Sequence, residues 1–231
     1  MNIFSAGAAQ AVVTQITEKF QRESGNLVNA NYGAVGAMKA RVVAGEPADV
    51  IILTAALIDE LIQQGLVVAG SRVDLGKVGT GVAVRAGTPL PDVRESRVLR
   101  GNMLAANKIV CPDPAVATAG KVVLKVLDQL GIAEQVKPRL QFFPHGYAAM
   151  AHLAQSSGML ELGITQITEI VANKGVTLVG PLPAELQNIA VYAVGLAARS
   201  AHPERSKELI RRLTGFNAQA VLSAAGFDIS R

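Results

Sequence analysis

The stretch Asn31-Tyr32-Gly33-Ala34-Val35-Gly36-Ala37-Met38-Lys39 holds the residues whose types and spacing best suit the binding of a small ion. Its pattern predicts the end of a strand, a turn of small residues and the start of a helix. The first N–H groups of a helix have no partner within the helix, so a helix start with only small residues around it suits an anion. The stretch has no Walker lysine and no GxGxxG spacing, and the alternative is an ordinary βα turn in which glycine only eases the backbone.

The side chains that usually perform catalysis or hold metals are few and dispersed. His145, His152 and His202 form no HxxxH or HExxH motif, and the single cysteine, Cys111, lies in an apolar run. One cysteine excludes an intrachain disulfide, and the spacing gives no support to a zinc site. There is also no nucleophile elbow and no phosphate loop. We therefore expect no metal, no cofactor and a buried structural thiol, and we assign no catalytic residue.

The composition indicates a folded chain with a large apolar core. Of its 231 residues, 50% are hydrophobic and 17% are charged, which suits one large domain or two lobes of about 100 residues. Aromatic residues make up 4%, with no Trp, and the densest basic run, residues 205–212, alternates with glutamate and apolar residues. That pattern is typical of a solvated helix face, so we expect no nucleic-acid partner. The net charge of +4 favours anions weakly.

Membrane spans and signal peptides indicate the cellular compartment of a protein, and here they leave both the cytoplasm and the periplasm open. No apolar run approaches the length of about 18 residues that a membrane span needs, so the chain is not expected to span a membrane. Met1 stands directly before a short strand, with no signal-peptide pattern. We expect either a cytoplasmic protein or the mature form of a periplasmic protein given a starting Met.

Apolar periodicity, broken by glycine and proline, predicts strands and helices that alternate along the chain. The first 65 or so residues have the order β-α-β-α-β-α, which is typical of a parallel sheet with right-handed crossovers. Strands are predicted at residues 3–6, 27–32, 50–53, 79–85, 108–111, 140–143, 162–165, 176–179 and 190–197. Helices are predicted at residues 7–23, 37–44, 56–64, 118–130, 148–156, 203–213 and 217–225, with a turn or short helix at 168–172.

Two of these strands, residues 79–85 and 190–197, are predicted to carry the chain between two lobes. The terminal helices then return to the first lobe. This predicts a discontinuous first lobe, residues 1–77 plus 198–231, and a continuous second lobe, residues 78–197, with a cleft between them.

Several short motifs occur in an order and spacing that point to one family. They are Phe4-Ser5-Ala6-Gly7-Ala8, Tyr32-Gly33-Ala34-Val35-Gly36 with Gly45-Glu46-Pro47-Ala48-Asp49-Val50, Asp113-Pro114 with Thr118-Ala119-Gly120, Leu162-Gly163-Ile164, and Ala225-Gly226-Phe227. With them the chain resembles, over nearly its whole length, the molybdate-binding branch of the type II periplasmic binding proteins, the solute receptors of ABC transporters. The resemblance implies an α/β fold of two lobes, each a mostly parallel sheet flanked by helices, with an oxyanion held in the cleft by hydroxyls and helix-start N–H groups.

The resemblance also implies which residues contact the ligand. By position, the family's two ligand serines fall on Ala8 and on Val35 or its neighbours, and its ligand tyrosine falls on Gln166. Backbone donors of the second lobe fall on Ala119 and near Gly146. The predicted ligand-binding residues are Ser5, Gly7, Ala8, Tyr32, Gly33, Ala34, Val35, Thr118, Ala119, Gly146, Tyr147 and Gln166. For Ser5 and Thr118 the alternative is a helix cap, and for Tyr32 it is plain packing.

Because the serines and the tyrosine are replaced, the sequence argues against molybdate as the ligand. Each hydrogen bond to a charged acceptor is worth roughly 1.5–3 kcal/mol, and a bare tetrahedral oxyanion loses several of them here. A larger anion with an apolar skeleton, such as an organic carboxylate, fits the small apolar side chains of Ala8 and Val35 better.

Three functions use such a fold, and two of them stay open at this point. The first is a monomeric receptor that closes over a small anion and presents it to an ABC permease. The second is an isomerase of an unsaturated tricarboxylate, such as aconitate isomerase, in which His145, Tyr147, Tyr32 or Lys39 acts as the base. The third, a transcription-regulator domain, needs a helix-turn-helix that this chain lacks.

Overall fold

The chain forms two compact units, and the computed structural model describes residues 1–230 of it. Unit 1 comprises Met1–Val78 together with the chain from Ala190 onward, and unit 2 comprises Gly79–Ile189. The chain enters unit 2 within β4 (Val73–Arg85) and leaves it at the start of β9 (Ile189–Leu196). From the sequence we predicted that the chain returns to the first lobe at residue 198, whereas β9 already pairs with β3 of unit 1.

Unit 1 is built on the strand order β2-β1-β3-β9, in which β1 pairs in parallel with β2 and β3, and β9 is antiparallel to β3. Its elements are β1 (Asn2–Ala6), the 3₁₀-helix η1 (Gly7–Ala9), α1 (Gln10–Ser24), β2 (Asn29–Gly33), α2 (Val35–Val43), β3 (Val50–Thr54), α3 (Ala55–Gln63), the first part of β4, β9, α9 (Pro203–Thr214) and α10 (Phe216–Ala224).

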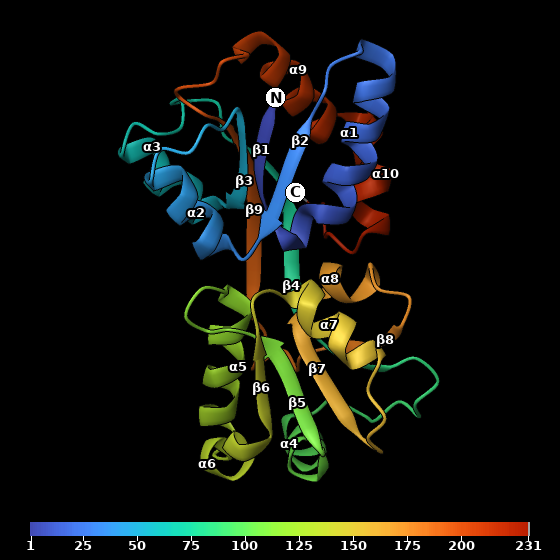
Figure 1. The fold of residues 1–231 in the computed structure, drawn as a ribbon. Helices are drawn as coiled ribbons and strands as arrows, with labels where there is room; N and C mark the ends of the chain where they lie inside the picture. The colour runs from blue at the N-terminus through green and yellow to red at the C-terminus, as the bar shows by residue number, and fades with distance from the viewer. Residues whose placement is uncertain (231) are drawn as a thin grey trace. The chain divides into compact units, whose positions relative to one another are not determined.

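Helices cover both faces of this sheet, with α2 and α3 on one side and α1, α9 and α10 on the other (Figure 1). Residues 50–53 of β3 are fully buried, as the continuous apolar run of a central parallel strand predicts. On α1, Val12, Val13 and Phe20 face the core, which is the helical spacing that the sequence shows.

Unit 2 is built on β6, β5 and β7, which run in parallel in that order, followed by β4, which is antiparallel to both β7 and β8. Its elements are the second part of β4, α4 (Ser96–Ala105), β5 (Lys108–Pro112), α5 (Thr118–Gln129), α6 (Ala133–Val136), the 3₁₀-helix η2 (Lys137–Arg139), β6 (Leu140–Phe143), α7 (Gly146–Ala154), β7 (Glu161–Gln166), α8 (Ile167–Val171) and β8 (Val176–Pro181).

The two faces of the unit 2 sheet pack against different helices because successive side chains of a strand point to opposite faces. Ile109 and Cys111 of β5 lie in one core cluster with the apolar residues of α5 and α4. Val110, between them, lies in a second cluster with Ala149, Met150 and Leu153 of α7. Figure 1 shows α5 and α7 on opposite sides of β5.

The helices α4 and α6 were not predicted from the sequence. Half of the α4 residues are polar or glycine, Gly101 interrupts the stretch, and only Leu99 and Met103 are buried, so its apolar pattern is short. The short α6 has a single buried residue. Among the helices of residues 1–230, none combines the length and apolarity that a bilayer crossing requires.

The buried carboxylate of Asp49 ties three separate segments of unit 1 together. It accepts hydrogen bonds from the backbone N–H of Asn2 at 2.7 Å, from the Ser200 hydroxyl at 2.6 Å and from the backbone N–H of His202 at 3.2 Å. Burial alone would raise the pKa of Asp49, but these hydrogen bonds outweigh it and hold the pKa below its ordinary value. Asp49 therefore fixes the start of β3 to the start of β1 and to the chain before α9.

Replacing Asp49 with alanine should lower the free energy of unfolding by about 3 kcal/mol, because buried N–H donors lose a charged acceptor. The measurement is urea unfolding followed by circular dichroism. Asp59→Ala, which removes a half-exposed partner of Arg72, should cost about 1 kcal/mol or less. The gap between wild type and Asp49→Ala should narrow as the pH falls through the lowered pKa of Asp49. Equal losses in the two variants would contradict this role.

Candidate functional site

In unit 1 the parallel strands end at one edge of the sheet, and a helix starts directly after each. The register pairs Ser5 with Tyr32 and Ala6 with Gly33, so the ends of β1 and β2 lie side by side. The residues that precede η1, α2 and α3 are Ala6, Ala34 and Thr54, and none of their side chains caps its helix. The first N–H groups of these helices therefore have no side-chain acceptor at their caps, which is the arrangement that suits an anion.

The structure brings together the ligand residues that the sequence predicts in unit 1. Gly7 and Ala8 lie in η1 at the end of β1, Gly33 ends β2, and Ala34 and Val35 form the N-cap and first turn of α2. All five are buried. These residues offer backbone groups and small apolar side chains to that edge, and no hydroxyl.

The polar side chains predicted there already have partners within unit 1. The Ser5 hydroxyl donates to the carbonyl of Ala6 at 3.0 Å, and since Ala6 is the N-cap of η1, Ser5 is not a helix cap. The Tyr32 hydroxyl lies 3.0 Å from the Thr14 hydroxyl of α1. Burial raises the pKa of Tyr32, and its bond to Thr14 opposes the rise only in part. Lys39 is hydrogen-bonded to Glu60.

In unit 2 the carboxyl ends of β5, β6 and β7 likewise lead to helix starts. Ala117 is the N-cap of α5, so Thr118 is its first residue and does not cap it, and Ala119 is buried behind it. Gly146 and Tyr147 begin α7 after the N-cap His145, and Gln166 is both the last residue of β7 and the N-cap of α8. The predicted ligand residues of unit 2 therefore all lie at the start of a helix.

His145 is a structural cap. Its imidazole Nδ1 accepts a hydrogen bond from the backbone N–H of Ala148 at 3.2 Å, and burial lowers the pKa of His145. Since Nδ1 accepts, the neutral ring carries its proton on Nε2. His145 can therefore donate a hydrogen bond from Nε2, while the lone pair on Nδ1 already accepts one from Ala148.

Glu169, which was not predicted from the sequence, forms hydrogen bonds at the starts of α7 and α8 in unit 2. Its carboxylate accepts from the Thr165 hydroxyl at 2.5 Å and from the backbone N–H groups of Gln166 and Gly146. A Cβ on Gly146 would lie 1.9 Å from Oε2 of Glu169, so only glycine fits beside this carboxylate. The N–H of Gly146 is thus directed at Glu169. The signal in the sequence was an acid within the otherwise uncharged stretch of residues 162–171.

Burial raises the pKa of Glu169 to about 7, and its three hydrogen bonds oppose the rise. No charged neighbour contributes to this shift. The carboxyl group is therefore near half-ionised at neutral pH, which is unusual for a glutamate.

Three residues of the β4–β7 pair and of α8 have buried side-chain groups without hydrogen-bond partners. We call Thr80, Gln166 and Thr168 the neutral polar cluster. Gln166 is 3% exposed, and neither its amide oxygen nor its amide nitrogen has a partner. Thr80 is opposite Gln166 in the β4–β7 pair, and the hydroxyls of Thr80 and Thr168 are also buried and unpartnered. Of these three residues, Gln166 was predicted from the sequence and the two threonines were not.

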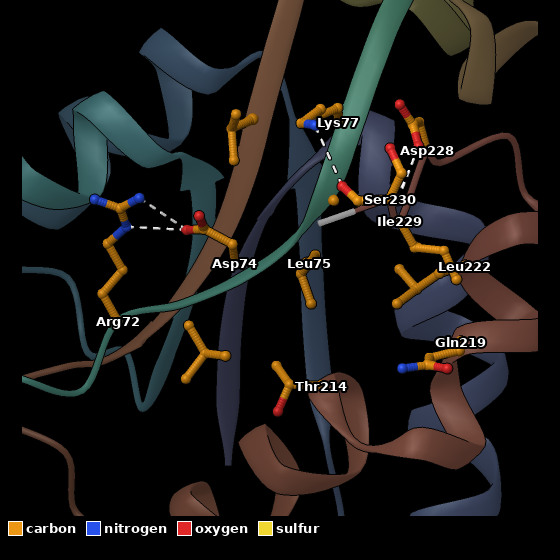
Figure 2. A pocket seen from close by; sticks show the side chains of 13 residues that line it. Arg72, Asp74, Leu75, Lys77, Thr214, Gln219, Leu222, Asp228, Ile229 and Ser230 are labelled. Atoms are coloured by element: carbon orange, nitrogen blue, oxygen red, sulfur yellow. Dashed lines mark hydrogen bonds and ion pairs between the residues drawn. The ribbon is translucent and has the colours of Figure 1, made fainter.

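A cavity elsewhere in unit 1 contains none of the predicted ligand residues. It has a volume of about 670 Å³, and β4, α10 and the C-terminal segment line it (Figure 2). The polar groups of its wall bond to one another, as Lys77 does to the carbonyl of Ser230 at 3.2 Å and Arg72 to Asp74 at 2.8 Å. We therefore do not include it in the candidate site.

Other groups that do chemistry are scarce among residues 1–230. No three His, Cys, Asp or Glu side chains in this part of the chain lie close enough to hold a metal ion. Cys111 is buried, and burial raises the pKa of its thiol to about 12, so it is not a thiolate at neutral pH.

Comparison with known proteins shows which family has this architecture. The family model described as bacterial extracellular solute-binding protein matches residues 1–228. Aconitate isomerase of Pseudomonas sp is 26% identical over 98% of this chain and 86% of that protein. A putative ABC transporter substrate-binding lipoprotein, YvgL of Bacillus subtilis (strain 168), is 22% identical over 98% of this chain and 85% of that protein.

The solved structures confirm the predicted α/β fold class. The periplasmic molybdate-binding protein of Azotobacter vinelandii superposes with a TM-score of 0.83 at 22% identity, covering 100% of both chains. Together with the family match, this likeness also confirms the predicted resemblance to the molybdate-binding branch of the type II binding proteins.

The unusual pKa of Glu169 predicts a pH-dependent stability. Because the folded pKa lies above the ordinary value of 4.5, the stabilising contribution is complete below that value and is lost as the pH rises through about 7. Between these limits the free energy of unfolding should fall by about 3 kcal/mol. Urea unfolding at pH 4 and pH 8 measures this difference.

The matched variants are Glu169→Gln, which has no titrating group, and Glu134→Gln, which changes a carboxyl that is 86% exposed in the same unit. Glu169→Gln should flatten the pH dependence in this range, and Glu134→Gln should leave it unchanged. An unchanged slope in Glu169→Gln would rule out Glu169 as its source.

Proposed function

The chain belongs to the bacterial extracellular solute-binding protein family, and on that premise we propose that it is the solute receptor of an ABC-type transporter with a small organic carboxylate as its ligand. The partner is the transporter's permease, as the name of the Bacillus relative indicates. The receptor acts as a monomer outside the cytoplasmic membrane, and in the periplasm where an outer membrane is present.

The observation that carries the ligand class is the edge of the unit 1 sheet. Its helix starts offer backbone N–H groups, while Ala8 and Val35 stand where the family resemblance expects ligand serines, and the Ser5 hydroxyl is bonded to its own backbone. Backbone donors suit a carboxylate, and the alanine and valine side chains suit its hydrocarbon skeleton. A tetrahedral metal oxyanion needs more donors than this edge provides.

The relative named aconitate isomerase makes an isomerase the second candidate function. Such a reaction removes a proton from the carbon next to the double bond and returns a proton to the far alkene carbon, so it needs a base with an available lone pair. Among the side chains proposed for that base, Lys39 bonds to Glu60, Tyr32 to Thr14, and Nδ1 of His145 to the N–H of Ala148. These contacts favour the receptor.

Isothermal titration should therefore detect binding of a di- or tricarboxylate, such as succinate or tricarballylate, and not of molybdate or sulfate. At a free ligand concentration of 100 times Kd, a true ligand should stabilise the protein by about 2.7 kcal/mol. Binding of molybdate with no response to any carboxylate would overturn the proposed ligand class.

The variant Val35→Pro tests the helix start itself. Proline is tolerated at the first helical position and removes only the N–H of that residue. Val35→Pro should weaken carboxylate binding by roughly 10- to 100-fold. Phe216→Pro makes the same change at the first position of α10, where the side chain is 84% exposed and borders a groove with Lys19 and Glu23 in the later half of α1. This control should leave Kd unchanged, and equal effects of the two variants would remove the helix start of α2 from the site.

The isomerase alternative is tested with trans-aconitate, followed by proton NMR for appearance of the cis isomer. We expect binding without conversion over hours at equimolar protein. If conversion occurs, the receptor assignment fails, and a loss of rate of at least about 100-fold in His145→Gln would then identify the base.

A further inference from the structure

In the neutral polar cluster, Thr80, Gln166 and Thr168, the backbone of Thr80 is held by hydrogen bonds, but the side chains of all three residues have no hydrogen-bond partners. The amide of the Gln187 side chain holds Thr80 by its backbone, since Oε1 accepts from the Thr80 N–H at 2.8 Å and Nε2 donates to the Thr80 carbonyl at 3.0 Å. Gln166 lies opposite Thr80 in an antiparallel pair, so their side chains share one face of the sheet. Thr168 follows two residues later in α8.

Buried polar side chains in folded proteins almost always have hydrogen-bond partners, because an unpaired buried group lowers stability. Here the amide of Gln166, the hydroxyl of Thr80 opposite it and the hydroxyl of Thr168 two residues further along are all unpaired. All three side chains are at most 3% exposed. A cluster of this kind indicates a binding site in which a bound molecule supplies the missing hydrogen bonds.

The chemistry of the cluster is uncharged, and this decides which part of a ligand it suits. None of its side chains carries a charge, so the cluster offers no electrostatic partner to an ionised group. An ionised carboxylate has only acceptor atoms, so it pairs with the amide N–H of Gln166 and leaves the amide oxygen unpaired. A hydroxyl group both donates and accepts, and it can pair with the amide oxygen and with a threonine hydroxyl.

We propose that the neutral polar cluster recognises a hydroxyl group on the ligand, so that the preferred ligands are hydroxycarboxylates. This inference rests on the proposed function, the binding of an organic carboxylate. The hydroxyl of the ligand pairs with the side chains of Gln166, Thr80 and Thr168. A site that hydrogen-bonds a hydroxyl discriminates strongly against the analogue without it.

The test uses pairs of ligands that differ by one hydroxyl, malate against succinate and citrate against tricarballylate, with Kd measured by isothermal titration. In wild type, the hydroxylated member of at least one pair should bind 30-fold or more tighter. In Gln166→Leu that ratio should fall below about 3-fold, chiefly because the hydroxylated ligand binds more weakly. Thr80→Val should lower the ratio in the same direction, and the matched control Thr177→Val, on β8, should leave it unchanged.

The melting temperature without ligand gives a second measurement that does not depend on binding. Because Gln166→Leu replaces an unpaired buried amide with an apolar side chain of similar size, the melting temperature should rise by a few degrees. A marked fall would show that the amide is already paired, by an ordered water, and would overturn the inference.

The remaining outcomes separate the inference from the proposed function. Equal Kd values within both ligand pairs in wild type would overturn the hydroxyl preference and leave carboxylate binding intact. A ratio that persists in Gln166→Leu would also overturn it, because the cluster would then not be its source. Failure of all four carboxylates to bind would instead overturn the proposed function, and the inference with it.

Discussion

The unsatisfied N–H groups at the starts of the helices are the feature on which the rest of this structure depends. Parallel strands of one sheet end at the same edge, and short connections start the next helix there. In unit 1 the caps at Ala6, Ala34 and Thr54 contribute no side-chain acceptor. The sheet topology thus concentrates partial positive charge at one edge, and the small residues around it keep that edge open to an anion.

The two units treat their helix starts differently. In unit 2 the carboxyl group of Glu169 accepts from the backbone N–H groups of Gly146 and Gln166. These helix-start donors are therefore already paired within the unit, while the side-chain amide of Gln166 has no partner.

The sequence was sufficient for the strands, most helices and the positions of the helix starts, because these follow from local periodicity and from glycine and proline. It was not sufficient for the side-chain partners, which depend on contacts between distant segments. Tyr32 meets Thr14 across 18 residues, and Asp49 meets Ser200 across 151. Thr80 became a candidate only through its register opposite Gln166. The helix α4 was missed because packing of Leu99 and Met103 outweighs a weak local pattern.

The same contacts bear on how one fold serves both receptors and isomerases. Holding an anion requires N–H donors, which any sequence can supply at a helix start. Moving a proton requires in addition a side chain whose lone pair is available, and here the backbone N–H of Ala148 occupies that lone pair on His145. The imidazole that caps α7 is thereby kept as a donor through Nε2, and a neutral donor stabilises a bound carboxylate without taking a proton from it. On this chain, the bond that orders the start of α7 also occupies the Nδ1 lone pair that His145 would need to act as a base.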